Sequence, residues 1–239
     1  MNIEVLADSQ SVAERAASLI ADEARNAVAA RGSFTLAVSG GRTPWAMLRA
    51  LGGATIPWQA VHILQVDERV APPGHPDRNL THIRESLFPH QAALSQIYPM
   101  PVELPDLNAA ASQYAGTLRQ LAGTPPVIDL VHLGLGPDGH TASLVPGDPV
   151  LDVESADVGL TGPYQERRRM TLTYPVLNRA RRVLWVVTGG EKEEMVNRLL
   201  AGDRSIPAGR VRNDAAVLLA DCAAAAAHRP ARQGGAQCA

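Results

Sequence analysis

Short apolar runs alternate with segments of helical periodicity along most of this chain, and this alternation strongly constrains its fold. Extended segments are expected over residues 34–38, 61–66, 127–133, 157–161, 183–187 and 216–219. Helices are expected over residues 11–31, 45–51, 79–88, 107–121 and 191–200, and an alanine-rich helix after the last strand. Strands that alternate with helices form parallel sheets with helices on both faces. The sequence therefore predicts an α/β fold with three layers, α/β/α, around a mostly parallel central sheet.

The chain of 239 residues is long enough for one large α/β domain, expected over residues 1–228, with a low-complexity, disordered tail over residues 229–239. Aromatic residues make up only 4% of it, which favours aliphatic packing between helices and sheet. The two cysteines, Cys222 and Cys238, both lie near the C-terminus, so a reducing cytoplasm fits better than a secreted disulfide framework.

The remaining bulk properties restrict the partners that we expect. The formal net charge of −2 gives no support for a nucleic-acid partner. The N-terminus shows no signal-peptide pattern, and no apolar run approaches the ~20 residues that span a bilayer. We therefore expect a cytoplasmic protein that binds neither nucleic acid nor membrane. We further expect a monomer or weak homodimer that binds a small molecule.

A glycine-rich loop carries the strongest chemical signal. Residues 134–141 follow the apolar run 127–133 and include His140, just before a segment that could open a helix. In open α/β sheets the loops at the carboxyl ends of the strands carry the chemistry, and a histidine can exchange a proton near neutral pH. By itself this stretch is equally compatible with a turn that carries an incidental surface histidine.

A second glycine-rich loop, residues 39–44, follows the strand expected over residues 34–38. Thr43 can cap the next helix and Pro44 suits its first turn. Glycines before a helix N-terminus expose backbone N–H groups that favour an anion. The alternative is an ordinary tight turn between a strand and a helix.

Two charged segments could complete an anion site. Asp67, Glu68 and Arg69 stand at the end of the second expected strand, where an acid can orient a sugar hydroxyl and an arginine can bind phosphate. A surface ion pair is the alternative. Residues 167–169 are three arginines that enter an extended segment, and one of them pointing into a cleft would add a phosphate ligand.

Several reaction classes lack their residues. The sequence has no Gly-x-Ser-x-Gly motif, and neither cysteine stands in a catalytic context. His132 and His140 belong to no metal-binding motif, so we expect no metal. One histidine, nearby acids, arginines and glycine-rich loops suit general-base attack of water on an anionic substrate.

Four blocks of the chain, in this order, resemble the 6-phosphogluconolactonase family. They are residues 39–44, Asp67-Glu68-Arg69 with Asn79, residues 134–147, and residues 169–173 with Pro175, Leu177 and Asn178. The resemblance runs from residue 8 to residue 221. It implies the fold shared by glucosamine-6-phosphate deaminase and ribose-5-phosphate isomerase. It also implies a carboxylic ester hydrolase that converts 6-phospho-D-glucono-1,5-lactone to 6-phospho-D-gluconate in the oxidative pentose phosphate pathway, without cofactor or metal.

The resemblance also implies roles for particular residues. His140 is expected to activate water, backbone N–H groups of the glycine-rich loops to stabilise the oxyanion, and Asp67 to be the second catalytic residue. The residues expected to bind the substrate or its phosphate are Ser39, Gly40, Gly41, Arg42, Thr43, Arg69, Asn79, Gly136, Asp138, Gly139 and Arg169. Many family members carry a lysine in a proline-rich run ahead of Arg169. Residues 162–168 differ from that run, which leaves open which of the three arginines at 167–169 meets the phosphate.

Two other functions compete with this interpretation. Glucosamine-6-phosphate deaminases have a similar histidine loop, but they carry a glutamate where this chain has Val145 and a tyrosine where it has Arg69. A sugar-phosphate sensor would need no His140 and would carry a DNA-binding or partner domain, for which no segment is left over. Both comparisons favour the lactonase.

Overall fold

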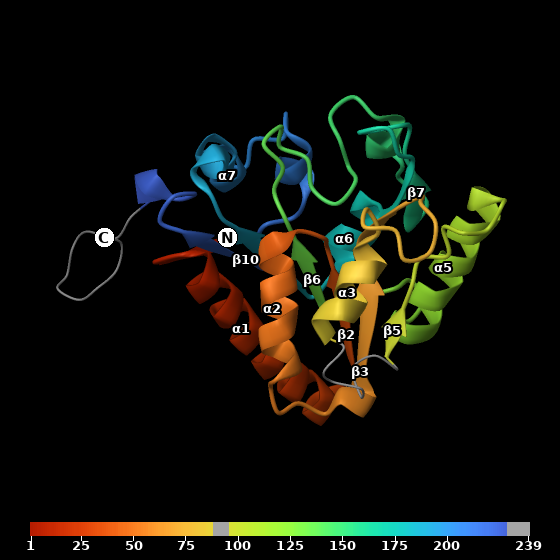
Figure 1. Cartoon of the computed structure of the whole chain (residues 1–239), viewed down its shortest axis with the longest axis horizontal. Coiled ribbons are helices and arrows are strands. Elements are labelled where there is room, and N and C mark those ends of the chain that lie inside the picture. Colours follow the sequence, from red (N-terminus) through yellow and green to blue (C-terminus); the bar gives the residue numbers. More distant parts are fainter. Residues whose placement is uncertain (88–95, 229–239) are drawn as a thin grey trace.

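The computed structural model describes residues 1–87 and 96–228, and within them seven strands form a parallel sheet (Figure 1). The order of the strands is β1-β10-β9-β6-β2-β3-β5. Their bounds are Asn2–Leu6 for β1, Phe34–Val38 for β2, Val61–Gln65 for β3, Ile97–Tyr98 for β5, Leu130–Leu133 for β6, Arg182–Val187 for β9 and Ala216–Asp221 for β10. The expected parallel sheet is therefore confirmed. The edge strands β1 and β5 were not predicted.

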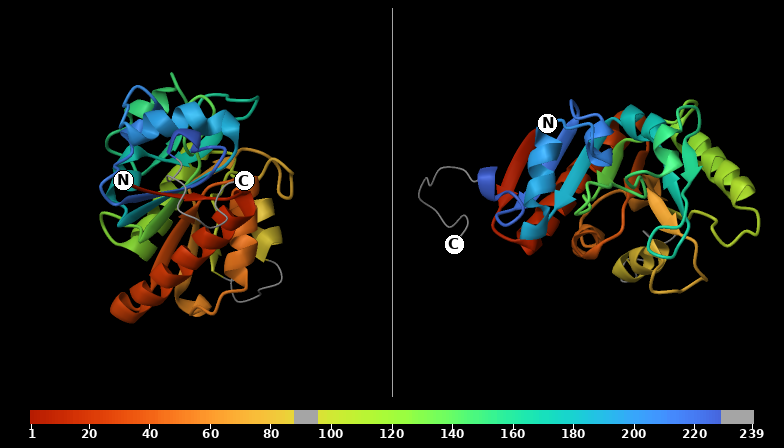
Figure 2. Two further views of the ribbon diagram at one scale, coloured as in Figure 1. Left: turned by 90° about the vertical axis from the view of Figure 1, so that its left-hand side faces the viewer. Right: turned by 90° about the horizontal axis from the view of Figure 1, so that it is seen from above.

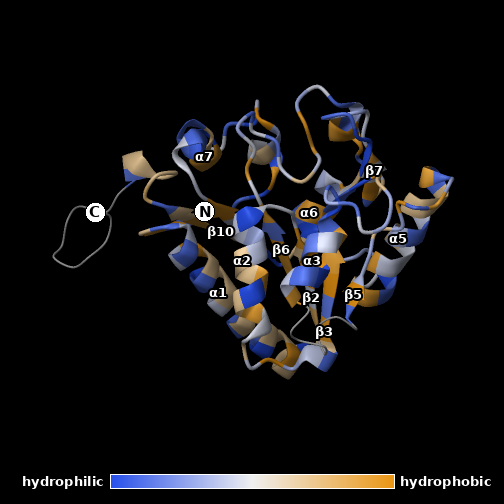
Figure 3. Cartoon of the chain, in the orientation of Figure 1, coloured by the Kyte–Doolittle hydropathy of each residue, from blue (hydrophilic) through white to orange (hydrophobic). Residues whose placement is uncertain are grey.

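Helices cover both faces of this sheet, which confirms the three-layer fold (Figures 1 and 2). The helices of one face are α1 (Ser9–Arg31), α2 (Arg42–Gly52) and α3 (Asn79–Leu87), and those of the other are α5 (Leu107–Ala122), α6 (Tyr174–Arg179) and α7 (Glu193–Leu200). Each face has its own core of mainly aliphatic side chains. The helices carry both hydrophobic and hydrophilic colours (Figure 3).

A small antiparallel sheet stands beside the large one and was not predicted. Its order is β4 (Asp67–Arg69), β8 (Arg169–Leu172) and β7 (Val158–Leu160). The chain therefore changes sheets directly after β3, at Val66. Of its strands, β7 matches a predicted strand, β8 falls at the extended segment expected after the three arginines, and β4 was not predicted, because its partner β8 lies far along the chain.

Some local predictions were wrong. No helix opens after His140, because Thr141 and Leu144 pair in a tight turn in which Ala142 has a φ of 52°. The alanine-rich segment after β10 contains only a 3-10 turn, Ala226–His228. Other 3-10 turns lie at Trp58–Ala60, Pro149–Asp152, Gly190–Lys192 and Pro207–Arg210.

The helix caps were predicted with mixed success. Asp106 caps α5 as expected, since its side chain accepts hydrogen bonds from the N–H groups of Asn108 and Ala109. Thr43 does not cap α2. The N-cap is Gly41, whose φ of 132° favours glycine, and no described side chain caps the helix. The first N–H groups of α2 therefore lack both intrahelical partners and a cap.

The strand order places a crevice between β2 and β6. From β2 the chain passes through α2 to β3 and β5 on one side, and it later returns through α5 to β6 on the other side of β2. Ligands of open α/β sheets bind at such a reversal, outside the carboxyl ends of the strands. The two glycine-rich loops leave β2 and β6 at this point.

Among the described residues, no helix is long and apolar enough to cross a bilayer. The predicted tail, residues 229–239, lies outside the described residues, and so does Phe88 at the end of one predicted helix. The division into domain and tail stays a prediction.

Candidate active site

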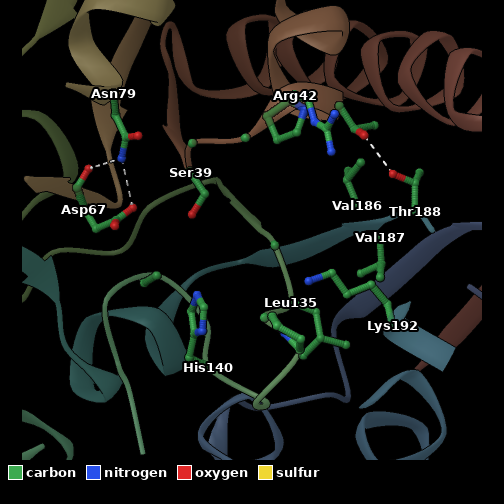
Figure 4. A pocket seen from close by; sticks show the side chains of 18 of the residues that line it. Ser39, Arg42, Asp67, Asn79, Leu135, His140, Val186, Val187, Thr188 and Lys192 are labelled. Carbon is green, nitrogen blue, oxygen red and sulfur yellow. Dashed lines mark hydrogen bonds between the residues drawn. The ribbon is translucent and has the colours of Figure 1, made fainter. Parts of the chain in front are cut away.

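A pocket of about 350 Å³ lies at the carboxyl ends of β2 and β6, where the reversal of strand order predicts a ligand site. Figure 4 shows Asp67 and Asn79 on one side of it and Arg42, Thr188 and Lys192 on the other, with His140 between the two sides. The predicted site residues that line the pocket are Ser39, Gly40, Gly41, Arg42, Thr43, Asp67, Arg69, Asn79, Gly136, His140 and Arg169. Residues from four predicted segments thus meet in one place.

Asp138 and Gly139 do not line the pocket, although both were expected to bind the substrate. Asp138 instead contacts His140. The backbone of Gly139 packs against Ile206, and a Cβ at residue 139 would lie 2.7 Å from the Cβ of Ile206. Both residues therefore stabilise the histidine loop from outside the pocket.

His140 is held in a defined orientation by Asp138. Its Nδ1 lies 2.5 Å from Oδ1 of Asp138, and the same oxygen accepts the backbone N–H of His140 at 3.1 Å. Burial raises the pKa of Asp138, but the hydrogen bonds and charge of His140 outweigh it, so that pKa lies below its ordinary value. The ionised carboxylate keeps the imidazole proton on Nδ1, which leaves the lone pair of Nε2 to accept a proton.

Gly136 allows the imidazole of His140 to fold back over its own loop. A Cβ at residue 136 would lie 2.1 Å from Nδ1 of His140 and 2.7 Å from Oδ1 of Asp138. The turn is closed by the N–H of Gly136, which donates to the carbonyl of His140 at 2.8 Å. A side chain at residue 136 would therefore displace the pair formed by Asp138 and His140.

The N-terminus of α2 and the residues facing it give the pocket a positive side. Ser39 is buried and its Oγ has no hydrogen-bond partner among the described residues. Thr43 and Thr188 share a hydrogen bond of 2.8 Å between their hydroxyls, which joins α2 to the end of β9. The uncapped N–H groups of α2, Arg42 and Lys192 favour an anion here.

Asp67 lies on the opposite side within a buried polar cluster. Its Oδ2 accepts a hydrogen bond of 2.6 Å from Oγ of Ser143, and its backbone carbonyl accepts one of 3.0 Å from Nδ2 of Asn79. Burial raises the pKa of Asp67, whereas the bond from Ser143 and the charges of Arg69 and Arg169 oppose that rise. Ser143 thereby ties the loop that carries His140 to the small sheet.

Arg69 and Arg169 face each other across the small sheet. The antiparallel register pairs them directly, so their side chains leave the same face of the ladder. Nη1 of Arg69 donates to the carbonyl of Asp77 at 2.9 Å, and Nη2 of Arg169 donates to Oε1 of Gln165 at 3.1 Å. Two like charges at paired positions repel each other, so an anion bound between them would be stabilised.

The structure separates the three consecutive arginines by position. Arg167 donates through Nε to Oδ2 of Asp77 at 3.1 Å, and Arg168 is exposed. Arg169 is buried and lines the pocket, and its Nε has no hydrogen-bond partner among the described residues. The sequence left open which of the three arginines meets the phosphate, and Arg169 is the one that lines the pocket.

Lys192 and Tyr164 were missed by the sequence analysis. Lys192 follows two glycines at the end of β9, which is the same signal that marked the other two loops, but these residues were assigned to the start of a helix. Burial lowers the pKa of Lys192, against the charges of Glu191 and Asp138. No local feature of the sequence marked Tyr164 as a site residue.

The described residues offer no ready metal centre. Within residues 1–87 and 96–228, no three His, Cys, Asp or Glu side chains are grouped so that they could hold an ion. His132 is fully buried, and its Nδ1 accepts the backbone N–H of Ser39 at 3.2 Å. Burial lowers the pKa of His132 to about 3, so this residue stays neutral and supports the loop after β2.

Sequence comparisons find a family model and relatives that match most of the chain. A family model described as glucosamine-6-phosphate isomerases/6-phosphogluconolactonase matches residues 7–219. A 6-phosphogluconolactonase of Synechocystis sp. is 35% identical over 204 residues, which cover 83% of this chain and 85% of that protein.

Solved structures are similar over nearly the whole chain. The crystal structure of 6-phosphogluconolactonase from Thermotoga maritima matches with a TM-score of 0.81 and 26% identity, over 92% of this chain and 98% of that one. A monomeric glucosamine-6-phosphate deaminase matches with a TM-score of 0.81 over 95% of this chain and 99% of that one. Its identity of 19% makes it a likeness of fold alone.

Proposed function

The chain belongs to the family of glucosamine-6-phosphate isomerases and 6-phosphogluconolactonases, and we propose that it hydrolyses 6-phospho-D-glucono-1,5-lactone to 6-phospho-D-gluconate with His140 as the general base. It is an enzyme of the lactone-hydrolysing group within that family, whose reaction belongs to the pentose phosphate pathway. The observation that carries the proposal is that His140, paired with Asp138, lines a pocket that is also lined by three arginines and a lysine.

In the proposed reaction, His140 acts first as a base and then as an acid. Nε2 removes a proton from a water molecule whose oxygen attacks the lactone carbonyl, and the ionised Asp138 stabilises the imidazolium that results. When the bond between the carbonyl carbon and the ring oxygen breaks, His140 returns the proton to that oxygen. The carboxylic acid product then releases one proton to solvent. No covalent intermediate is required.

Charge would develop on the carbonyl oxygen during the attack. The N–H groups at the start of α2, together with Arg42 and Lys192, supply positive potential on that side of the pocket. The N–H groups of Gly136 and Gly139 are engaged within their own loop, so we assign the oxyanion to the loop after β2.

The small sheet would hold the rest of the substrate. Arg69 and Arg169 are our choice for the 6-phosphate, because they are paired across β4 and β8 and both line the pocket. Asp67 and Asn79 lie next to these arginines. The carboxylate of Asp67 would accept hydrogen bonds from sugar hydroxyls, and the amide of Asn79 would accept or donate them. Asp67 would thereby position the lactone for attack.

One observation separates this proposal from a deaminase. A deaminase of this fold pairs its histidine with an acid, at the place where this chain carries Val145. Val145 is buried and apolar, so it can neither donate nor accept a proton. The site keeps the base but lacks the acid for ring opening.

Freshly prepared 6-phosphogluconolactone provides the test. Proton release should be faster with the protein than the spontaneous rate, and unphosphorylated gluconolactone should react more slowly. Glucosamine 6-phosphate should give no ammonia. Release at the spontaneous rate, or ammonia formation, would overturn the proposal.

A further inference from the structure

A tight hairpin at residues 164–167 lies beside the histidine loop. Tyr164 and Arg167 exchange backbone hydrogen bonds of 2.9 and 3.3 Å, with Gln165 and Glu166 at the turn. These two residues have φ values of 49° and 64°, a conformation that glycine or asparagine adopts more readily. Strained backbone of this kind is concentrated at functional sites, so the contacts of the hairpin need an explanation.

Tyr164 contacts both halves of the proposed site. Its hydroxyl donates to Oδ2 of Asp138 at 3.3 Å, and its ring meets the ring of His140 edge-on, with 5.7 Å between the centroids. The guanidinium carbon of Arg169 lies 4.9 Å from the centroid of the same ring. One side chain therefore touches the base, the carboxylate that orients the base, and one of the two arginines assigned to the phosphate.

The two carboxylate oxygens of Asp138 have separate partners. Oδ1 accepts from His140, and Oδ2 accepts from Tyr164. A carboxylate that is bonded at both oxygens cannot rotate freely, so the hydroxyl of Tyr164 fixes the plane in which Asp138 meets His140. Burial and the charge of Asp138 both raise the pKa of Tyr164, which keeps this hydroxyl protonated as a donor.

The hairpin is also anchored on the arginine side. Gln165 accepts a hydrogen bond from Nη2 of Arg169, and Arg167 binds the carboxylate of Asp77, whose backbone carbonyl accepts from Arg69. The face of an aromatic ring attracts a guanidinium and limits its orientations. The ring of Tyr164 thus restricts Arg169, while its hydroxyl restricts Asp138.

We propose that Tyr164 is a positioning residue with two separable functions: its hydroxyl orients the pair formed by Asp138 and His140, and its ring orients Arg169 toward the phosphate of the substrate. This inference rests on the proposed function. The inference goes beyond the proposed function because it assigns a role to Tyr164. This residue lies in residues 162–168, which differ from the lysine-containing run of many family members.

Two substitutions separate the two functions. Tyr164→Phe removes the hydroxyl and keeps the ring, so kcat should fall roughly two- to tenfold, the value of one net hydrogen bond, while KM stays unchanged. Tyr164→Leu removes both, so KM for the phosphorylated lactone should also rise by a similar factor. The KM for unphosphorylated gluconolactone should not rise. A merely structural role would not produce this division.

Tyr98→Phe is the matched control. Tyr98 also pairs with a histidine, since its hydroxyl lies 3.2 Å from Nδ1 of His62 and the two rings meet edge-on. It lies outside the residues that line the pocket. The kcat and KM of the Tyr98→Phe protein should match those of the unchanged protein. That result would show that loss of a tyrosine hydroxyl near a histidine does not by itself lower activity.

A double-mutant cycle tests the route through Asp138. In a protein that carries Asp138→Asn, adding Tyr164→Phe should lower kcat by much less than it does alone, because the hydroxyl acts through that carboxylate. An undiminished effect would overturn the positioning role, and so would a Tyr164→Phe protein with unchanged kcat. If the unchanged protein does not hydrolyse the lactone at all, the proposed function fails, and this inference fails with it. Normal hydrolysis with no effect of either Tyr164 substitution would overturn the inference alone.

Discussion

The parallel sheet and the small antiparallel sheet contribute different groups to the same pocket. The parallel sheet supplies the loops after β2, β6 and β9, and with them His140, the N-terminus of α2 and Lys192. The antiparallel sheet supplies Asp67, Arg69 and Arg169 from β4 and β8. In our proposal the first side carries out the chemistry, and the second recognises the substrate.

The two sides are also built in different ways. Each of these loops is a short, continuous segment that contains at least two glycines and directly follows an apolar strand. The arginines of the antiparallel sheet come together because Arg69 pairs with Arg169, far along the chain. Ser143 and Tyr164 join the two sides, because Ser143 of the histidine loop donates to Asp67 and Tyr164 contacts both Asp138 and Arg169.

The largest expected effect tests the chemical side. Positioned proton transfer contributes roughly 10²- to 10⁴-fold, so His140→Ala should lower kcat by about that factor with a smaller change in KM. Rates should be measured with fresh 6-phosphogluconolactone over a range of pH. The activity of the unchanged protein should fall in acid, because a protonated histidine cannot act as a base.

His228→Ala is the control for that substitution, because His228 lies in the last 3-10 turn and contacts Asn197 instead of the pocket. It should leave kcat unchanged. A folded His140→Ala protein with nearly unchanged kcat would contradict the hypothesis that the parallel-sheet side carries out the chemistry.

The next effect concerns the recognition side. A hydrogen bond to a charged group contributes about 1.5–3 kcal/mol, so Arg69→Ala or Arg169→Ala should lower kcat/KM by roughly ten- to a hundredfold. The loss should be much larger for the phosphorylated lactone than for unphosphorylated gluconolactone. Arg168→Ala is the matched control, because Arg168 is the exposed neighbour of Arg169 and should have little effect.

Equal losses on both lactones would mean that these arginines do not bind the phosphate. In that case Lys192→Ala becomes informative. A loss confined to the phosphorylated lactone in that variant would place the phosphate beside α2 and reverse the orientation of the substrate.

A smaller effect separates stability from activity at Asp67. Burial raises the pKa of Asp67, so its ionised form opposes folding at neutral pH. Asp67→Asn should therefore keep or raise the melting temperature while kcat/KM falls about tenfold or more. A large drop in melting temperature would show that the ionised carboxylate is mainly structural.

The stability difference at Asp67 should depend on pH in a defined direction. A raised pKa means that the folded protein binds this proton more tightly than the unfolded chain does. The contribution of Asp67 to stability is thus present at low pH and lost as pH rises through the raised pKa. Thermal melts should show the advantage of Asp67→Asn at neutral pH, and it should shrink as pH falls.

The smallest expected effect is that of a chelator. The reaction that we propose needs no metal, so EDTA should leave kcat unchanged on both lactones. Loss of activity that a divalent ion restores would return His132 and His140 to consideration as ligands and would remove the simple general-base role of the parallel-sheet loop.

Much of the parallel side could be predicted because its signals are local. The strands β2, β3, β6 and β9 are mainly apolar runs, and glycines indicate the loops that follow β2 and β6. The cap at Asp106 was also local. Even here, three local predictions were wrong: Gly41 is the N-cap of α2 in place of Thr43, no helix opens after His140, and the alanine-rich segment after β10 forms only a 3-10 turn.

The sequence by itself predicted the three-layer fold, because the alternation of strands and helices can be read along the chain. It also predicted the position of His140 at the end of β6 and the glycine loop before α2, because each depends on neighbours within a few residues. Tertiary structure alone decided that Arg69 faces Arg169, that Arg169 rather than Arg167 or Arg168 lines the pocket, and that Tyr164 touches Asp138. The physical reason is that strand pairing and side-chain contacts between distant segments depend on the path of the whole chain, which leaves no mark in any short stretch of sequence.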